Sequence, residues 1–254
     1  FYKQQRKMII AVNARTLRAV PRDGIGWFTL EVVSGMVRNH PEHRFVLIGD
    51  RRYGRLPAEG NRQHEQATAE GNRQDEQAPA ADARASGILP VEGRNVEYVT
   101  IPLRTVHPLL WHAWHEYLLP PVLKRIKADL FIAPDGMIPL RTEVPCIPVI
   151  HDLNHEHRPG DIPGGECRYY RRRFPLFAAK GARVATVSHF SAGDIAATYG
   201  ISPDKIDVVP NGVAAVFSPP QPGEAEETRR QYTGGRPYFL FVSNFSPRKN
   251  VEAV

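Results

Sequence analysis

The chain has 254 residues, of which 42% are hydrophobic and 24% are charged. This composition excludes a wholly disordered protein, because disorder requires low apolar content together with high net charge. The net charge of +6 indicates an anionic partner, which leaves nucleic acid, an anionic membrane surface and a phosphorylated substrate open.

The N-terminal segment, the apolar runs and the cysteines indicate the cellular compartment of the protein. No window reaches the roughly 18 consecutive apolar residues of a spanning helix, and no small-residue cleavage site follows the N-terminal segment. We therefore expect neither a transmembrane nor a secreted protein. Cys146 and Cys167 lie far apart without a CxxC partner, which excludes a disulfide framework and a zinc ribbon and favours a reducing compartment.

The first fifty residues predict a strand, a helix and a second strand. An apolar run predicts the strand over residues 7–13, and a loop follows over 14–26. Helical spacing of apolar residues predicts a helix over 28–38, and a second strand is expected over 44–48. This order is the unit of a parallel sheet with crossover helices.

An internal repeat interrupts this pattern. The 11-residue unit AEGNRQHEQAT is followed at once by AEGNRQDEQAP, within residues 58–79. Its only apolar residues are alanines, so it cannot bury a hydrophobic stripe as a coiled coil would. We expect a disordered surface insertion over residues 57–87.

Short apolar strands then alternate with helices. The Trp/His-rich segment HPLLWHAWHEYLLPPVLKRI predicts a helix interrupted at Pro120-Pro121. Ser191 with Asp194 resembles a capping box at the start of another helix, which Gly200 ends. The expected strands are 96–101, 128–133, 146–150, 183–187 and 205–209, and the other helices are 169–180 and 191–199.

The last part of the chain predicts a boundary. A linker of low hydrophobicity over residues 219–236 precedes an apolar strand at 238–242, and the chain stops twelve residues later. One strand cannot bury its own faces, so we expect one complete α/β domain over residues 1–218 and the start of a second over 237–254.

Two glycines follow the first predicted strand. Gly24 and Gly26 would let backbone amides approach an anion at a helix N-terminus. Thr29 stands where a dinucleotide fingerprint has its third glycine, which argues against a nicotinamide site. A ligand-binding loop and a plain turn both remain open.

An imidazole and a carboxylate follow the strand at 146–150. Ligands of open α/β sheets bind at the carboxyl ends of strands, and His151 and Asp152 lie there. Both side chains can hydrogen-bond sugar hydroxyls, and His can act near neutral pH. The alternatives are a His that caps the strand end, or a metal site with His155 and His157.

Further polar pairs follow two later strands. Ser188-His189 lacks a Gly-x-Ser-x-Gly elbow, so a helix N-cap is the better interpretation of its serine. Arg248 and Lys249 lie between the strand at 238–242 and an expected helix, where cations and the helix dipole can hold a diphosphate. A solvated basic turn is the alternative.

The cluster Arg168-Tyr169-Tyr170-Arg171-Arg172-Arg173 could attract nucleic acid or anionic lipid headgroups. A solvated helix face is the plainer interpretation. Trp111 and Trp114 share a helix face and are expected to be packing residues. No nucleic-acid-binding motif is present, so we expect no nucleic-acid partner.

Four stretches, taken in chain order, resemble the family-4 retaining glycosyltransferases. These enzymes have two facing Rossmann-like domains in the GT-B architecture. The four stretches are GIGWFTLEVV, VIHDLNHEHRPG, ATVSHFSAGDIAATYGISPDKIDVVPNGV and YFLFVSNFSPRKNVEAV. The resemblance implies a fold of the α/β class: a Rossmann-like, doubly wound parallel sheet as the acceptor-side domain, followed by a donor-binding domain truncated after its first strand.

The resemblance also implies an activity and a set of site residues. A sugar would pass from a nucleoside-diphosphate sugar to a glycan or lipid-linked acceptor with retention of configuration, with no metal and no cofactor besides this co-substrate. His151 would contact the transferred sugar, with Asp152 supporting the site. Gly24, Gly26, Arg248 and Lys249 would bind the donor phosphates, and Trp27 would lie on the acceptor side.

The setting implied is surface-polysaccharide synthesis in the cytoplasm or at the inner face of the membrane, with GDP-mannose as the expected donor. Because the family's nucleobase contacts would lie beyond Val254, we expect this chain alone to be inactive. Two alternatives remain open. One is a non-catalytic fragment that binds membrane or glycan through its basic surface, and the other is a GT-B sugar epimerase.

Overall fold

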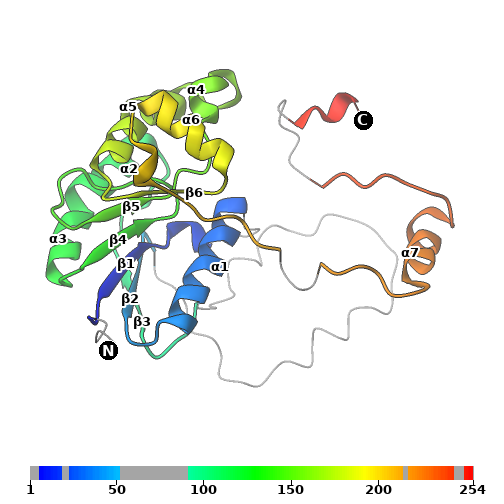
Figure 1. The fold of residues 1–254 in the computed structure, drawn as a ribbon, viewed down its shortest axis with the longest axis horizontal. Coiled ribbons are helices and arrows are strands. Elements are labelled where there is room, and N and C mark those ends of the chain that lie inside the picture. The colour runs from blue at the N-terminus through cyan, green and yellow to red at the C-terminus, as the bar shows by residue number, and fades with distance from the viewer. Residues whose placement is uncertain (1–5, 19–22, 52–90, 214–216, 243–248, 254) are drawn as a thin grey trace.

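The computed structural model in Figure 1 describes residues 6–18, 23–51, 91–213, 217–242 and 249–253. Its strands are β1 (Ile9–Asn13), β2 (Arg44–Gly49), β3 (Val96–Thr100), β4 (Leu130–Ala133), β5 (Cys146–Pro148), β6 (Val184–Thr186) and β7 (Ile206–Val208). Its α-helices are α1 (Gly24–Asn39), α2 (Pro108–Ala113), α3 (Leu119–Arg125), α4 (Asn154–His157), α5 (Gly164–Lys180), α6 (His189–Tyr199) and α7 (Glu224–Thr233).

The strands form a parallel sheet in the order β3-β2-β1-β4-β5. The parallel pair β6-β7 extends it through a bridge between Val149 and Ala185. The strand order runs outward in one direction from β1 and in the other from β4, so a topological switch point lies between these two strands. This arrangement confirms the predicted fold class, an α/β, Rossmann-like, doubly wound parallel sheet.

Both faces of the sheet are covered by helices (Figure 1). Val33 and Val37 of α1 pack with one set of strand side chains. Leu119 and Leu123 of α3 and Phe177 of α5 pack with the alternate set on the opposite face. Strands buried on both faces are expected to be continuously apolar, as β1 and β2 are. The carboxyl edge of the sheet is left for ligands.

The helical segment after β3 differs from prediction, because it is not interrupted at Pro120-Pro121. Helix α2 leads through a π-helical turn, Trp114–Leu118, directly into α3. The two prolines occupy the first positions of α3, where their missing N–H groups are tolerated. In the π turn the backbone hydrogen bonds change from i→i+4 to i→i+5 just before the prolines, and the chain continues as helix.

The start of α6 also corrects one detail. Ser188, rather than Ser191, is the N-cap, and its hydroxyl accepts a hydrogen bond from the Ser191 backbone N–H at 3.0 Å. Asp194 therefore belongs to no capping box, and its carboxylate binds His157 instead. Gly200 ends the helix in the left-handed conformation with φ of 65°, as predicted.

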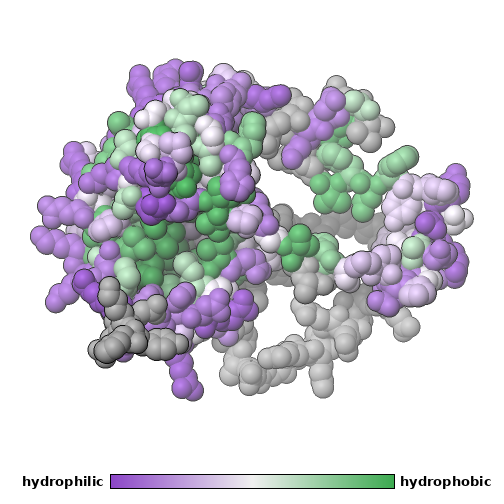
Figure 2. Space-filling view, in the orientation of Figure 1, coloured by the Kyte–Doolittle hydropathy of each residue, from purple (hydrophilic) through white to green (hydrophobic). Residues whose placement is uncertain are grey.

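The C-terminal part departs further from the sequence-based expectation. Helix α7 forms within the predicted linker 219–236, with three glutamates in its first turn that complement the helix dipole. The predicted strand at 238–242 does not form, because a strand needs a hydrogen-bonded neighbour and this segment has none in the described structure. Figure 2 shows its apolar side chains standing off the sheet domain. The predicted repeat insertion at 57–87 lies outside the described residues.

Candidate functional site

His151 lies just beyond β5, at the carboxyl edge of the sheet. Its Nε2 lies 2.8 Å from the carbonyl oxygen of Pro134, the residue that follows β4. A carbonyl can only accept, so Nε2 carries the proton and donates. The other ring nitrogen, Nδ1, is then the acceptor of the neutral ring. Phe28 of α1 contacts the ring edge-on at 4.9 Å between centroids, so the imidazole is held in one orientation.

The two predicted glycines lie inside the first turn of α1 rather than in a loop before it. The N-cap is Asp23, whose carboxylate accepts the Gly26 N–H at 2.7 Å. Trp27 is 51% exposed in the same turn, and Phe28 contacts His151. The structure thus brings this helix end and His151 together. An anionic ligand at this helix end would compete with the Asp23 carboxylate for the same amides.

Asp152 has a local role in the structure. Its carboxylate accepts hydrogen bonds from the Asn154 backbone N–H at 3.0 Å and from Asn154 Nδ2 at 2.8 Å. These bonds start the short helix α4, as an Asx turn does. The carboxylate is exposed beside His151 and has no hydrogen bond to it in the described structure.

The predicted diphosphate clamp is only partly within the described residues. Arg248 lies outside the described residues. Lys249 is exposed in the C-terminal segment 249–253, which Figure 1 shows standing away from the sheet domain. The site seen in the structure therefore consists of the sheet edge and α1.

Sequence reasoning missed a buried polar network at the switch point between β1 and β4. Arg15 and Asp135 form an ion pair at 2.6 Å, and both side chains are only 10% exposed. Asn13, the last residue of β1, donates its side-chain amide to the same carboxylate at 2.9 and 3.0 Å. The Arg15 guanidinium also lies over the Trp114 ring at 4.9 Å. One signal was available, because Asn13 ends β1 and Asp135 lies two residues after the end of β4.

A second buried pair lies behind this network. Glu116 of the π turn pairs with Arg173 of α5 and also accepts the Leu140 N–H at 3.1 Å. Burial lowers the pKa of the neighbouring His115 to about 3, so this imidazole is neutral at physiological pH. Burial likewise raises the pKa of Tyr169 to about 12. Of these four side chains, Glu116 and Arg173 carry charge at physiological pH, and His115 and Tyr169 are neutral.

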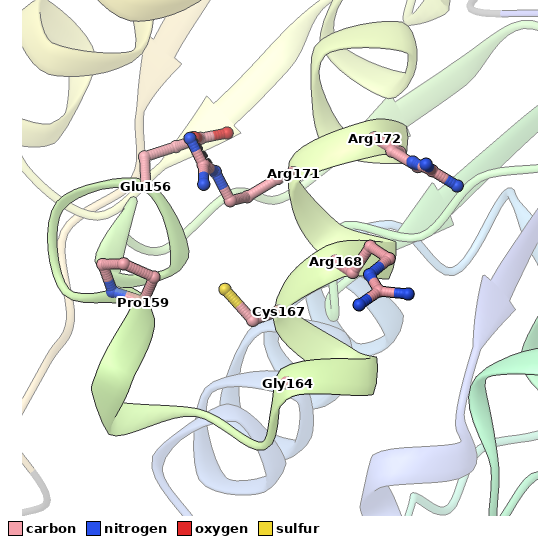
Figure 3. Close-up of a pocket in the computed structure, with 7 residues that line it drawn as sticks. All are labelled: Glu156, Pro159, Gly164, Cys167, Arg168, Arg171 and Arg172. Atoms are coloured by element: carbon pink, nitrogen blue, oxygen red, sulfur yellow. Dashed lines mark hydrogen bonds and ion pairs between the residues drawn. The ribbon is translucent and has the colours of Figure 1, made fainter.

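Two clefts flank α5. The smaller, of about 480 Å³, lies between α5 and α4 and includes Glu156, Cys167 and Arg168 (Figure 3). The larger, of about 880 Å³, lies between α5 and the start of α2. Neither cleft includes His151 or the glycines of α1. The smaller cleft is lined by residues that follow β5, and the larger by residues that follow β3 and β5.

The sequence profile of Glycosyltransferase Family 4 matches residues 22–217, which is more than half of the chain. The chain belongs to glycosyltransferase family 4. A glycosyltransferase from Rickettsia africae ESF-5 is similar at 14% identity and a TM-score of 0.43, over 89% of this chain and 49% of its own. Anabaena Alr3699/HepE, solved in complex with UDP and glucose, is similar at 13% identity and a TM-score of 0.45, over 90% of this chain and 50% of its own. The chain spans about half the length of these structures. A comparison with curated proteins found no match.

The two histidines of the alternative metal site, His155 and His157, have separate partners in this family-4 chain. His155 Nε2 lies 2.8 Å from the Tyr199 hydroxyl, and His157 Nε2 lies 2.9 Å from the Asp194 carboxylate. The two rings therefore do not converge on one ion. Among the described residues, His40, Glu42 and His43 bring potential metal-binding atoms together, at the opposite edge of the sheet.

Within the described residues, the basic cluster of α5 divides into paired and unpaired arginines. Arg171 binds Glu156 at 3.0 Å and Arg173 binds Glu116, whereas Arg168 and Arg172 are exposed. Trp114 is fully buried, so its predicted packing role is confirmed. In the described part of the chain, every helix is too short or too polar to cross a lipid bilayer.

Proposed function

We propose that this chain is the acceptor-side part of a retaining glycosyltransferase that uses a nucleoside-diphosphate sugar and a glycan or lipid-linked acceptor. The observation that carries the proposal is the family match over residues 22–217. It is supported by the position of His151, whose imidazole is held at the carboxyl edge of the sheet by a hydrogen bond from Nε2 to the Pro134 carbonyl. Surface-polysaccharide synthesis at the cytoplasmic face of a membrane is the proposed setting.

His151 has the geometry of a residue that recognises the transferred sugar. With Nε2 donating to Pro134, the neutral ring offers Nδ1 as an acceptor to a sugar hydroxyl. The ring needs no reorganisation when the substrate arrives, because Phe28 and the Pro134 carbonyl already hold it. Asp152, exposed beside it, would support the site through the start of α4.

The donor diphosphate is proposed to lie near the N-terminus of α1, where Gly24 leaves room for close approach because an added Cβ would meet nothing within 4 Å. Gly26 would contribute its amide once the Asp23 carboxylate moves aside. Arg248 and Lys249 would supply the cations, and Trp27 would lie at the acceptor side. GDP-mannose is the first donor to test, and no metal is required in the proposed reaction.

The test is a donor panel assayed with the chain and with the complete reading frame that encodes it. GDP-mannose and UDP-sugars are supplied with lipid-linked acceptors, and nucleoside diphosphate release is measured. We expect His151→Ala to lower transfer about tenfold, the value of one hydrogen bond to the sugar. His40→Ala, at the opposite edge of the sheet, is the matched control. Equal activities of the two variants in the complete reading frame, or no release from any donor by its product, would contradict the proposal.

A further inference from the structure

The groove between α2 and α5 combines exposed aliphatic side chains with a concave shape. Val106, Leu109 and Leu176 are 70%, 72% and 47% exposed, and all three line the cleft of about 880 Å³. Single exposed aliphatic residues are ordinary, but three that gather in one hollow mark a surface for an apolar ligand. The volume lies within the range of small-molecule sites.

Two unpaired guanidinium groups border this groove. Arg168 and Arg172 are one helical turn apart on α5 and line both the groove and the smaller cleft. In Figure 3 they project to one side of the helix, whereas Arg171 reaches towards Glu156. Within the described ranges, neither Arg168 nor Arg172 has a hydrogen bond or an ion pair. Two such groups at this spacing suit the oxygens of a phosphate or diphosphate.

The combination selects an amphiphile with an anionic head. A free nucleotide or glycan would leave the aliphatic wall in water, and a neutral lipid would leave the guanidinium pair unused. We propose that the groove binds the lipid phosphate of a lipid-linked acceptor, with the hydrocarbon chain against Val106, Leu109 and Leu176 and the phosphate on Arg168 and Arg172. This inference rests on the proposed function and assigns its acceptor to the lipid-linked class.

The groove is placed to present such an acceptor to the site. Its lining residues belong to the segments that follow β3 and β5, and His151 also follows β5. Tyr169 connects the two regions, because it lines the groove and lies close enough to Arg15 and Asp135 for their charges to shift its pKa. Arg173, in the groove wall, is fixed by the buried Glu116. A phosphate held outside this rigid wall leaves its attached saccharide free to extend along the edge.

The test measures binding of farnesyl phosphate to the 254-residue chain by calorimetry, below the concentration at which the lipid aggregates. Farnesol and inorganic phosphate are the reference ligands. We expect farnesyl phosphate to bind more tightly than either, and each of Arg168→Gln and Arg172→Gln to weaken it about tenfold. Leu109→Gln should weaken farnesyl phosphate and leave inorganic phosphate unchanged.

The matched control is the Lys124→Gln/Arg125→Gln variant, which removes the same charge as the Arg168→Gln/Arg172→Gln variant from exposed positions of α3. Equal weakening by both double variants would overturn the proposal in favour of net charge. The proposal would also be overturned if farnesyl phosphate bound no more tightly than inorganic phosphate. Arginine-dependent co-sedimentation with anionic phospholipid vesicles without binding of farnesyl phosphate would overturn it as well, because that result identifies a membrane surface. None of these measurements uses a sugar donor, so failure here leaves the donor assay to decide glycosyl transfer separately.

Discussion

Removing the Asp135 carboxylate should destabilise the fold more than removing any exposed acid. Asp135 accepts from Arg15, from the Asn13 amide and from the Met137 backbone N–H at 3.2 Å. In Asp135→Ala, Arg15 keeps its bond to Asn13 Oδ1 at 3.2 Å and its position over Trp114, but it loses its buried counter-charge. Breaking a buried pair costs about 3 to 5 kcal/mol, and these remaining contacts place the expected loss near 3 kcal/mol.

The assay is urea unfolding followed by circular dichroism, with Glu97→Ala as the control. Glu97 pairs with Arg44 across β2 and β3, and both side chains are about half exposed, so its loss should stay within about 1 kcal/mol. The Arg15→Leu/Asp135→Leu double variant should lose less than the sum of the two single changes, because no charge is then left buried. Equal losses in Asp135→Ala and Glu97→Ala would refute the argument that the network is buried and coupled.

Three further predictions concern single side chains. The pKa of His115 is about 3 in the folded chain and near 6.5 when unfolded, so its contribution to stability is present above pH 6.5 and is lost as the pH falls towards 3. His115→Leu should flatten the stability profile over that window in acid titrations. Burial raises the pKa of Cys146 to about 12, so iodoacetamide at pH 8 should label it only after unfolding, as peptide mapping would show. Ser188→Ala should lower the free energy of unfolding in urea by about 1 kcal/mol, because the α6 cap is lost. Ser191→Ala should lower it less, because residue 191 contributes its backbone N–H, not its side chain, to that cap.

The sheet was predictable because its strands are local patterns. Runs of apolar residues marked every strand of the sheet, and their alternation with helices fixes the parallel arrangement. The continuation of the helix through Pro120-Pro121 was not predictable, because proline normally ends a helix and nothing in the sequence marks a π turn before it. The segment at 238–242 was predicted as a strand from composition alone, and strand formation depends on a neighbour that composition does not supply.

The site was predictable in part. His151 was found because it directly follows an apolar strand, which places it at the carboxyl edge by a local rule. Arg15 was missed because its partner Asp135 lies 120 residues away, and only the pairing of β1 with β4 brings them together. The unpaired state of Arg168 and Arg172 was equally hidden, because the sequence shows four arginines without showing which of them meet Glu116 and Glu156.

One turn links the buried network to the proposed sugar-binding residue. Residues 133–136 close a turn in which Gly136 donates to Ala133 at 2.9 Å. Gly136 has φ of 78°, and an added Cβ would lie 2.9 Å from Phe174, so glycine is required there. Within this turn, the Pro134 carbonyl orients His151 while the next side chain, Asp135, neutralises Arg15. The charge pair therefore anchors the same peptide segment that sets the tautomer of His151, and the residue proposed to read the sugar depends on a contact made at the first strand of the chain.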